Sequence, residues 1–192
     1  MGVDLHGSET EKNLMRAFAG ESQARNRYTY AASVARKEGF VQISNIFLET
    51  ADNERAHAKV FYDHLQGGMV TFDATYPAGP AGCTADNLLA AAEGEKEEWS
   101  LLYAGFGETA EKEGFKAVAA SFKKIAAVEA YHERRFRRLL ANVEAGQVFA
   151  KPESLKWKCG NCGYVHEGAE APATCPACKH KQEHFEVWVE AY

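Results

Sequence analysis

The sequence predicts an all-α four-helix bundle followed by a small C-terminal metal-binding domain. Two proline-free stretches, residues 9–66 and 85–146, are rich in Ala, Glu, Lys, Arg and Leu, which favour helix. Each stretch is too long for one ordinary helix, and an internal Lys-Glu-Gly-Phe sequence divides each of them. After residue 146, glycine, proline, cysteine and aromatic residues replace this pattern, so a second domain is expected there.

An internal repeat relates the two helical stretches. Lys37-Glu38-Gly39-Phe40 recurs 75 residues later as Lys112-Glu113-Gly114-Phe115. Further pairs match at the same shift: Ile43 and Val118, Phe47 and Phe122, Ala51 and Ala126, Glu54 and Glu129, His57 and His132, and Phe61 and Phe136. Each half is therefore predicted to hold one antiparallel helix pair. Two such pairs, joined by the long connection of residues 69–82, give a four-helix bundle of the ferritin-like topology.

The domain boundary is predicted at residue 146. Residues 1–146 form the expected bundle, residues 147–192 form the second domain, and residues 147–156 are expected to be the linker. The last 46 residues are too few for a dependable apolar core. A bound metal is therefore expected to stabilise them.

Composition narrows the class of protein further. The chain has 22 basic and 27 acidic residues, a net charge of −5, and 46% apolar residues, which is typical of a soluble globular protein. Mild acidity argues against nucleic-acid binding, and no apolar run is long enough for a transmembrane helix. The first 16 residues lack the apolar core of a signal peptide. We expect a cytoplasmic protein without a membrane or nucleic-acid partner.

Two Glu-x-x-His motifs lie at matching places in the repeat. Glu54 and His57 are three residues apart, as are Glu129 and His132, so each pair shares one helical face. Glu54 falls within an apolar stripe of its helix, where a carboxylate is costly to bury unless it is paired or bound to metal. One such motif could arise by chance, but its recurrence in the repeat argues for a function.

The other helix of each half carries a matching glutamate. Glu21 and Glu95 each follow a glycine, and Glu98 shares a helical face with Glu95. A Glu from each of two helices, with Glu-x-x-His from the other two, is the ligand set of dinuclear iron or manganese bundles. Glutamates on these helices could instead be solvated surface charges, and we expect this for Glu93 and Glu97.

The spacing of these glutamates differs from that of the later helices. Glu95 follows Glu21 by 74 residues, whereas the later positions match at 75. The second half therefore has one extra residue between Glu95 and Gly114. We expect a π-bulge to absorb it, a feature that favours functional sites.

Four of the five cysteines form two Cys-x-x-Cys knuckles, Cys159 with Cys162 and Cys175 with Cys178. Clustered cysteines in a cytosolic protein indicate a metal site rather than disulfides. Four thiolates in a tetrahedral array suit zinc or a single iron, and a structural zinc ribbon is the alternative to an iron centre. Gly163 permits a tight turn that aims backbone amides at sulfur, which raises the reduction potential of an iron centre.

Together these motifs resemble the rubrerythrin family over essentially the whole chain. The matching segments are Glu21-Ser-Gln-Ala-Arg-Asn-Arg-Tyr28, both Glu-x-x-His motifs, Glu95-x-x-Glu98 and the two cysteine knuckles. The order of the domains, a ferritin-like bundle and then a rubredoxin-like domain, is also similar to that of the family.

The resemblance implies a carboxylate-bridged di-iron (Fe–O–Fe) centre and one rubredoxin-type iron held by four cysteines. Glu54 and Glu129 would bridge the irons, and one iron would exchange Glu98 for His57 on reduction. The implied di-iron ligands are Glu21, Glu54, Glu95, Glu98, Glu129 and His132, with His57 close by. The implied ligands of the single iron are Cys159, Cys162, Cys175 and Cys178, with His180 near it.

The implied activity is that of a non-haem peroxidase of oxidative-stress defence, which reduces hydrogen peroxide to water. Rubredoxin or an NAD(P)H-dependent reductase would supply electrons through the rubredoxin-like iron. Tyr28 and Tyr103 would donate hydrogen bonds to the ligands or to bound peroxide, unless they are ordinary buried tyrosines. The rival is a ferritin-like ferroxidase that stores iron. Glu98 and the cysteine domain argue against it, because storage needs no renewed supply of electrons.

The length of the last helix also predicts an assembly. From His132 to Ala145 the helix spans ~20 Å, so the C-terminal domain starts far from the dinuclear site of its own chain. A head-to-tail homodimer, which the resemblance to relatives also implies, would place the C-terminal domain of each chain beside the dinuclear site of the other. We expect residues 159–180 of one chain to approach the Glu21 side of the other, in a dimer that is domain-swapped or part of a higher assembly.

Overall fold

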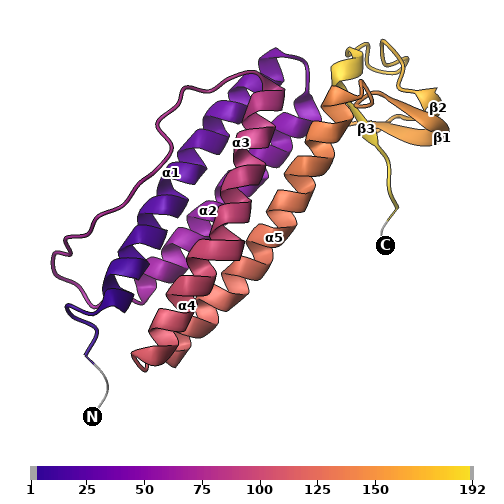
Figure 1. The fold of residues 1–192 in the computed structure, drawn as a ribbon. Coiled ribbons are helices and arrows are strands. Elements are labelled where there is room, and N and C mark those ends of the chain that lie inside the picture. The colour runs from indigo at the N-terminus through magenta and orange to yellow at the C-terminus, as the bar shows by residue number, and fades with distance from the viewer. Residues whose placement is uncertain (1–3, 191–192) are drawn as a thin grey trace.

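The computed structural model describes residues 4–190 and confirms the ferritin-like bundle with its small C-terminal domain. The first antiparallel pair consists of α1 (Glu9–Lys37) and α2 (Val41–Asp63). Residues 64–83 then form the crossover, which returns along α1 to the start of the second pair (Figure 1). No helix in the described part of the chain is long and apolar enough to cross a membrane.

The second pair contains the predicted irregularity. It begins as α3 (Thr84–Glu97), passes through the π-helical turn η1 (Glu98–Leu102), and continues as α4 (Tyr103–Lys112) before α5 (Lys116–Glu144). The expected π-bulge between Glu95 and Gly114 is thus confirmed, and it begins at Glu98 itself. One extra residue in this turn keeps the faces of α3 and α4 aligned with the bundle axis.

The Lys-Glu-Gly-Phe repeat forms the turn between the two helices of each pair. Gly39 and Gly114 have φ values of 83° and 90°, in the left-handed region that glycine adopts without a steric penalty. In both turns the N–H of the next phenylalanine donates to the carbonyl five residues before it, at 2.8 Å. The same sequence thus ends the first helix of each pair in the same way.

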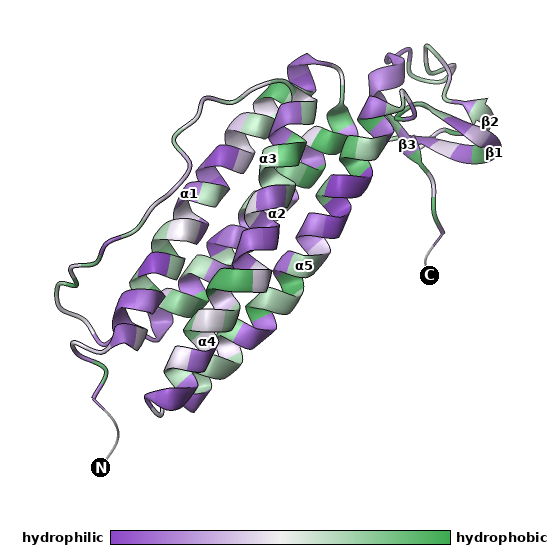
Figure 2. Ribbon diagram, in the orientation of Figure 1, coloured by the Kyte–Doolittle hydropathy of each residue, from purple (hydrophilic) through white to green (hydrophobic). Residues whose placement is uncertain are grey.

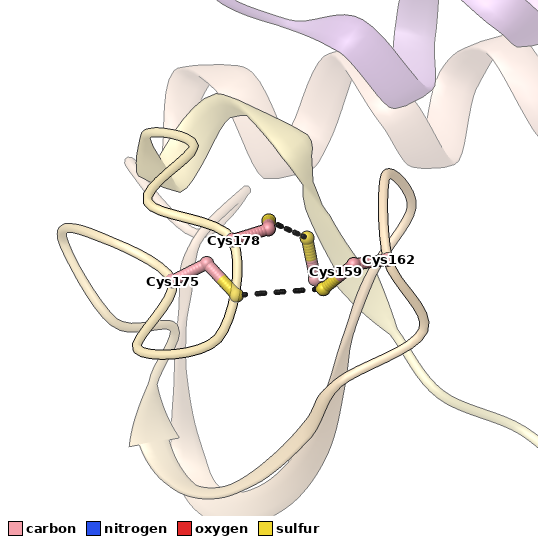
Figure 3. Close-up of side chains that lie close together, drawn as sticks. All are labelled: Cys159, Cys162, Cys175 and Cys178. Carbon is pink, nitrogen blue, oxygen red and sulfur yellow. Dashed lines mark hydrogen bonds between the residues drawn. The ribbon is translucent and has the colours of Figure 1, made fainter.

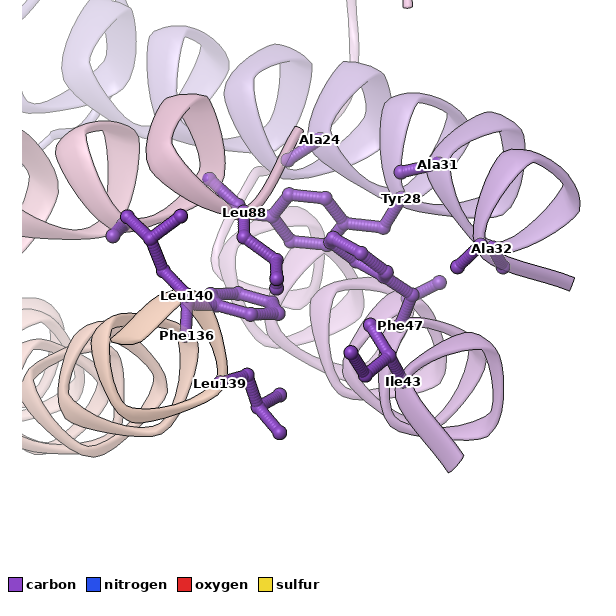
Figure 4. Packing of buried hydrophobic residues seen from close by; sticks show 14 residues of the cluster. Ala24, Tyr28, Ala31, Ala32, Ile43, Phe47, Leu88, Phe136, Leu139 and Leu140 are labelled. Carbon is purple, nitrogen blue, oxygen red and sulfur yellow. The ribbon is translucent and has the colours of Figure 1, made fainter. Parts of the chain in front are cut away.

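Two apolar clusters fill the bundle, and the conserved spacing of the repeat places the glutamates and histidines between them. Figure 4 shows the first cluster, in which the rings of Tyr28, Phe47 and Phe136 lie close together. The second cluster includes Phe61, Tyr103 and Phe122. Hydrophobic and hydrophilic residues are interspersed along each helix, as the hydropathy colouring of Figure 2 shows. Large-to-small changes at such buried rings typically cost 3–5 kcal/mol.

The C-terminal domain is a three-stranded antiparallel sheet closed by cysteine loops. Its strands are β1 (Ala150–Cys159), β2 (Val165–Glu170) and β3 (Phe185–Val187), in the order β2-β1-β3, with a short 3₁₀ turn η2 (Gln182–His184) before β3. Its small core is Trp157, Cys159, Ala171, Cys175 and Phe185.

The expected linker of residues 147–156 is wrong in most of its length, because β1 already begins at Ala150. Ala150 pairs with Glu170, and regular pairing resumes from Leu155 with Gly168 after an irregularity. Pro152 lies in that irregular stretch, where its missing N–H leaves no ladder bond unmade. Pairing with β2 holds this segment in the sheet.

The C-terminal domain packs on the end of the bundle. Phe149 stacks on Phe40 of the α1–α2 turn, with ring centroids 6.2 Å apart and planes at 11°. Lys151 Nζ donates to Asn142 Oδ1 of α5 at 2.8 Å. The C-terminal domain with β1, β2 and β3 therefore lies beyond the end of α5, as Figure 1 shows.

Candidate metal centres

The four long helical segments of the bundle, α1, α2, α3–α4 and α5, all contribute side chains to one buried cluster. Each of two groups of residues brings its donor atoms within 4.8 Å of one another. The first group is Glu21, Glu54, His57 and Glu129, and the second is Glu54, Glu95, Glu129 and His132. Glu54 and Glu129 belong to both. We refer to these six residues together as the dinuclear cluster.

The two shared glutamates each turn one oxygen toward each imidazole. His57 Nδ1 lies 3.1 Å from Glu54 Oε2 and 2.8 Å from Glu129 Oε1. His132 Nδ1 lies 3.2 Å from Glu54 Oε1 and 2.8 Å from Glu129 Oε2. This arrangement is the one that two carboxylates adopt when they bridge a pair of metal ions, each with its own histidine.

The donor atoms of this cluster are buried without hydrogen bonds that would satisfy them. Within residues 4–190, several buried atoms of the cluster approach one another as closely as 2.8 Å but make no well-directed hydrogen bond. They are Glu21 Oε2, Glu54 Oε1, Glu95 Oε2, both oxygens of Glu129, and His132 Nδ1. Such a concentration is costly in an apolar interior, since each unpaired group loses its hydration. Two cations would satisfy these atoms, and the mixture of carboxylate and imidazole suits iron or manganese. The residues present therefore fit a di-iron centre.

The pKa values show the same electrostatic strain. Burial, together with the charges of Glu54 and Glu129, raises the pKa of Glu95 to about 8. Burial alone would lower the pKa of His132, but the carboxylates of Glu129 and Glu54 raise it to about 12. In the absence of cations the cluster thus has to hold protons. Bound metal ions would displace those protons, as expected for carboxylate and imidazole ligands.

Two tyrosines orient Glu21 and Glu95, the two glutamates that are not shared between the groups of donor atoms. Tyr28 donates from its hydroxyl to Glu95 Oε1 at 2.5 Å, and Tyr103 donates to Glu21 Oε1 at 2.5 Å. In each glutamate the other oxygen, Oε2, faces the cluster without a hydrogen bond from the described residues. Such hydrogen bonds fix the direction of a ligand and tune its basicity.

Glu98 lies beside the dinuclear cluster but belongs to neither of the two groups of close donor atoms. Burial and the charges of Glu21 and Glu95 raise its pKa, so it lies close to the cluster carboxylates. The resemblance implied Glu98 as a ligand and His57 as a neighbour, whereas here His57 Nδ1 is within the cluster and Glu98 is outside it. Trp99, next to Glu98, donates from its Nε1 to Glu133 Oε2 at 2.7 Å.

The second centre is formed by the two knuckles of the C-terminal domain (Figure 3). Cys159 Sγ lies 3.7 Å from Cys178 Sγ, and Cys162 Sγ lies 3.7 Å from Cys175 Sγ. With metal–sulfur bonds of about 2.3 Å, the edge of a tetrahedron of thiolates is about 3.8 Å. The site therefore has the dimensions of a rubredoxin-type iron site.

The backbone of the second knuckle also suits a thiolate centre. The N–H of His180 bonds to the Cys178 sulfur and is the main cause of a pKa near 5 for that thiol. Lys179 has a φ of 65°, in the left-handed region, which turns the chain back over the sulfur. The His180 ring packs edge-on against His184, with centroids 4.7 Å apart. The His180 backbone thus contacts the Cys178 sulfur.

The pocket beside the cluster was not predicted from the sequence. A pocket of about 490 Å³ lies between α1, the α3–α4 segment and the crossover, and its wall includes Glu98 and Tyr103. Gly20 and Gly94, each directly before a cluster glutamate, also line it. The Gly-Glu pairs of the repeat were the available signal, because glycine at both places leaves space beside the glutamates.

The fold and the two sites define a class: a ferritin-like protein whose buried cluster fits two irons, joined to a rubredoxin-like iron domain that transfers electrons. Comparison with known families agrees. The family model described as Rubrerythrin matches residues 12–140, and that of the rubrerythrin rubredoxin-like domain matches residues 157–186. The chain belongs to the rubrerythrin family, whose members are oxidoreductases of the di-iron class.

Similar proteins match over nearly their full lengths. Rubrerythrin of Porphyromonas gingivalis is 58% identical over 97% of this chain and 93% of the relative. Rubrerythrin of Clostridium perfringens is 56% identical, covering 98% of each chain. Among solved structures, a mixed-valence state of nigerythrin is 29% identical with a TM-score of 0.63, covering 96% of this chain and 88% of that chain.

Proposed function

We propose that this protein is a cytoplasmic non-haem peroxidase that reduces hydrogen peroxide to water. The observation that carries the proposal is the presence of two kinds of centre in one chain. One is a buried cluster in which Glu54 and Glu129 each face both histidines, and the other is a four-cysteine site. Reduction of one peroxide takes two electrons and two protons, breaks the O–O bond and gives two waters. A di-iron pair supplies two electrons at once, and a single iron can restore them one at a time.

The side chains of the bundle would carry out distinct tasks in this reaction. Glu54 and Glu129 hold the two metal positions together, while Tyr28 and Tyr103 hold Glu95 and Glu21 in place. Glu98 and His57 would act as alternative ligands at one metal position. Support comes from their placement, since His57 reaches Glu129 at 2.8 Å while Glu98 stands beside the cluster in the π-turn.

Electrons would pass from an external donor to the four-cysteine site and then to the dinuclear cluster. We propose rubredoxin or an NAD(P)H-dependent reductase as the donor. From His132 to Glu144 α5 extends about 18 Å, and the C-terminal domain follows beyond that end. We therefore propose a head-to-tail homodimer in which residues 159–180 of one chain serve the cluster of the other.

Iron storage remains the rival function, because the bundle is also ferritin-like. Mycobacterium tuberculosis bacterioferritin aligns with a TM-score of 0.64 at 16% identity, covering 76% of this chain and 90% of that chain, which reflects the fold alone. The discriminating experiment mixes anaerobically reduced, iron-loaded protein with one equivalent of hydrogen peroxide. Rapid oxidation of both cluster irons with loss of the peroxide supports a peroxidase. Slow reaction with peroxide, together with a ferric mineral formed from added ferrous iron and air, would support storage.

A further inference from the structure

The pocket beside Glu98 is far larger than hydrogen peroxide requires. Its volume is about 490 Å³, whereas one water in the liquid occupies about 30 Å³. Pockets of 300–1,000 Å³ are typical of sites for small organic molecules. Since Glu98 and Tyr103 form part of the wall, the pocket extends from the crossover to the edge of the dinuclear cluster.

The walls of this pocket are mostly apolar and carry charged residues of both signs. The apolar lining comes from α1, the α3–α4 segment and the crossover, and includes Ala17, Leu102, Phe106 and Pro77. The basic residues of the lining are Arg16 and Arg27, and the acidic ones are Asp73, Glu97 and Glu98. The arginines are also engaged within the protein, Arg16 with Glu9 and Asp73 O, and Arg27 with Gln23. Such a lining favours an uncharged ligand with an apolar body.

Tyr76 of the crossover and Gly20 of α1 set the width of the pocket. The Tyr76 hydroxyl donates to the Arg16 carbonyl at 2.7 Å, which fixes the crossover against α1. A β-carbon at position 20 would lie 3.6 Å from Tyr76 Cε1, an ordinary contact distance. A methyl group can therefore occupy this space without displacing the ring, but it narrows the pocket next to Glu21.

We propose that this pocket binds the organic group of small, uncharged alkyl and aryl hydroperoxides, which the protein reduces in addition to hydrogen peroxide. The inference rests on the proposed peroxidase function. The hydroperoxide accepts two electrons and two protons, its O–O bond breaks, and an alcohol and one water form. The electrons come from the same external donor through the same two centres. Glu98 lies where the pocket meets the cluster, so the peroxide oxygens would lie at that end and the apolar group between Phe106 and Tyr76.

The test compares cumene hydroperoxide with hydrogen peroxide on the iron-loaded protein. Gly20→Ala is the narrowing variant, and Gly105→Ala is the matched control, because Gly105 has open space around it and lies outside this pocket. One methyl group in an apolar pocket changes selectivity about tenfold or more. We expect the ratio of kcat/KM for cumene hydroperoxide to that for hydrogen peroxide to fall about tenfold in Gly20→Ala and to stay constant in the control.

A binding measurement separates the pocket from the chemistry. The probe is 2-phenyl-2-propanol, which has the shape of the organic group but no O–O bond, titrated by ligand-observed NMR. We expect it to bind the parent protein and Gly105→Ala, and to bind Gly20→Ala about tenfold more weakly. Ala74→Leu, on the crossover side of the pocket, provides a second narrowing variant should Gly20→Ala fold poorly.

The outcomes distinguish the two proposals. Turnover of hydrogen peroxide without turnover of cumene hydroperoxide, or equal binding of the alcohol in parent and narrowed variants, would overturn the pocket assignment and leave the peroxidase proposal standing. If the parent protein reduces neither cumene hydroperoxide nor hydrogen peroxide, the proposed function itself is overturned.

Discussion

Glu113, in the turn before α5, accepts hydrogen bonds from Thr10 at the start of α1, from the backbone N–H at 2.8 Å and from the hydroxyl at 2.6 Å. Its counterpart in the repeat, Glu38, accepts from the N–H of Thr84 at the start of α3, at 3.0 Å. The glutamate of each Lys-Glu-Gly-Phe turn thus caps the first helix of the other half. This reciprocal contact explains why the glutamate occurs in both copies, since it ties the two helix pairs together.

We predict that Glu113→Ala lowers the free energy of unfolding by about 1–2 kcal/mol, because N-terminal donors of α1 lose their acceptor. Glu111→Ala is the control, an exposed neighbour outside this contact. Denaturant unfolding of the iron-loaded variants measures the difference. An equal effect from the two substitutions would contradict the capping role.

The same contact predicts a pH dependence. Burial opposes ionisation of Glu113, but the hydrogen bonds from Thr10 outweigh it and lower the pKa below 4.5. The native state therefore holds the proton less tightly than the unfolded chain does. The stability that Glu113 contributes is complete above pH 4.5 and is lost as the pH falls through the lowered pKa. The difference in stability between the parent and Glu113→Gln should shrink over that range, and a constant difference would argue against an ionised cap.

Glu98→Ala should keep the fold and slow the reaction with peroxide. Glu98 belongs to neither apolar cluster, so the core should survive, whereas the alternative ligand proposed above would be lost. We expect a fall of about 10–100-fold in the rate at which peroxide oxidises the reduced cluster, the scale of effects seen for groups that tune a metal site. Stopped-flow spectroscopy measures this rate, with Glu108→Ala as an exposed control. A rate equal to that of the parent would remove Glu98 from the mechanism.

Trp99 holds the π-turn against α5. Its Nε1 donates to Glu133 Oε2 at 2.7 Å, and Glu133 Oε1 accepts from Arg137 Nε at 2.7 Å. Trp99 directly follows Glu98 in the π-turn, and Glu133 directly follows His132 in α5. The hydrogen bond between Trp99 and Glu133 therefore links the π-turn to α5 next to the dinuclear cluster. We predict that Trp99→Phe slows peroxide turnover several-fold while unfolding changes by about 1 kcal/mol. Glu133→Gln keeps an acceptor oxygen, whereas Glu133→Ala does not. If the two variants turn over peroxide at the same rate, the hydrogen bond from Trp99 is not the cause of the slower turnover.

Mixed dimers test transfer between chains. Cys162→Ser damages the cysteine site, and Glu54→Ala removes a shared ligand of the cluster, so each homodimer should lack NAD(P)H-driven turnover. A hybrid pairs one intact cysteine site with one intact cluster on different chains. We expect activity to return in the hybrids after mixing and refolding. Hybrids that form, as shown by native mass spectrometry, but remain inactive would restrict transfer to a single chain.

Much of the site could be predicted because its ligands follow helical spacing. Glu-x-x-His at Glu54 and Glu129 fixes the face, the repeat fixes which helices meet, and the 74-residue spacing from Glu21 to Glu95 located the π-turn. Strand pairing of β1 was missed, where a linker was expected. Contacts between distant residues, such as Glu113 with Thr10 or Tyr76 with Arg16, depend on tertiary placement, which no local pattern encodes.

We propose that the four-cysteine site supplies electrons and that the dinuclear cluster reacts with peroxide. The most direct test is Cys162→Ser, measured twice in the same preparation. One measurement is the single-turnover oxidation of the chemically reduced cluster by peroxide, and the other is steady-state turnover driven by NADH with a reductase. We predict an unchanged single turnover and loss of NADH-driven turnover. If both fall together, or if neither changes, the division of labour between the two centres is contradicted.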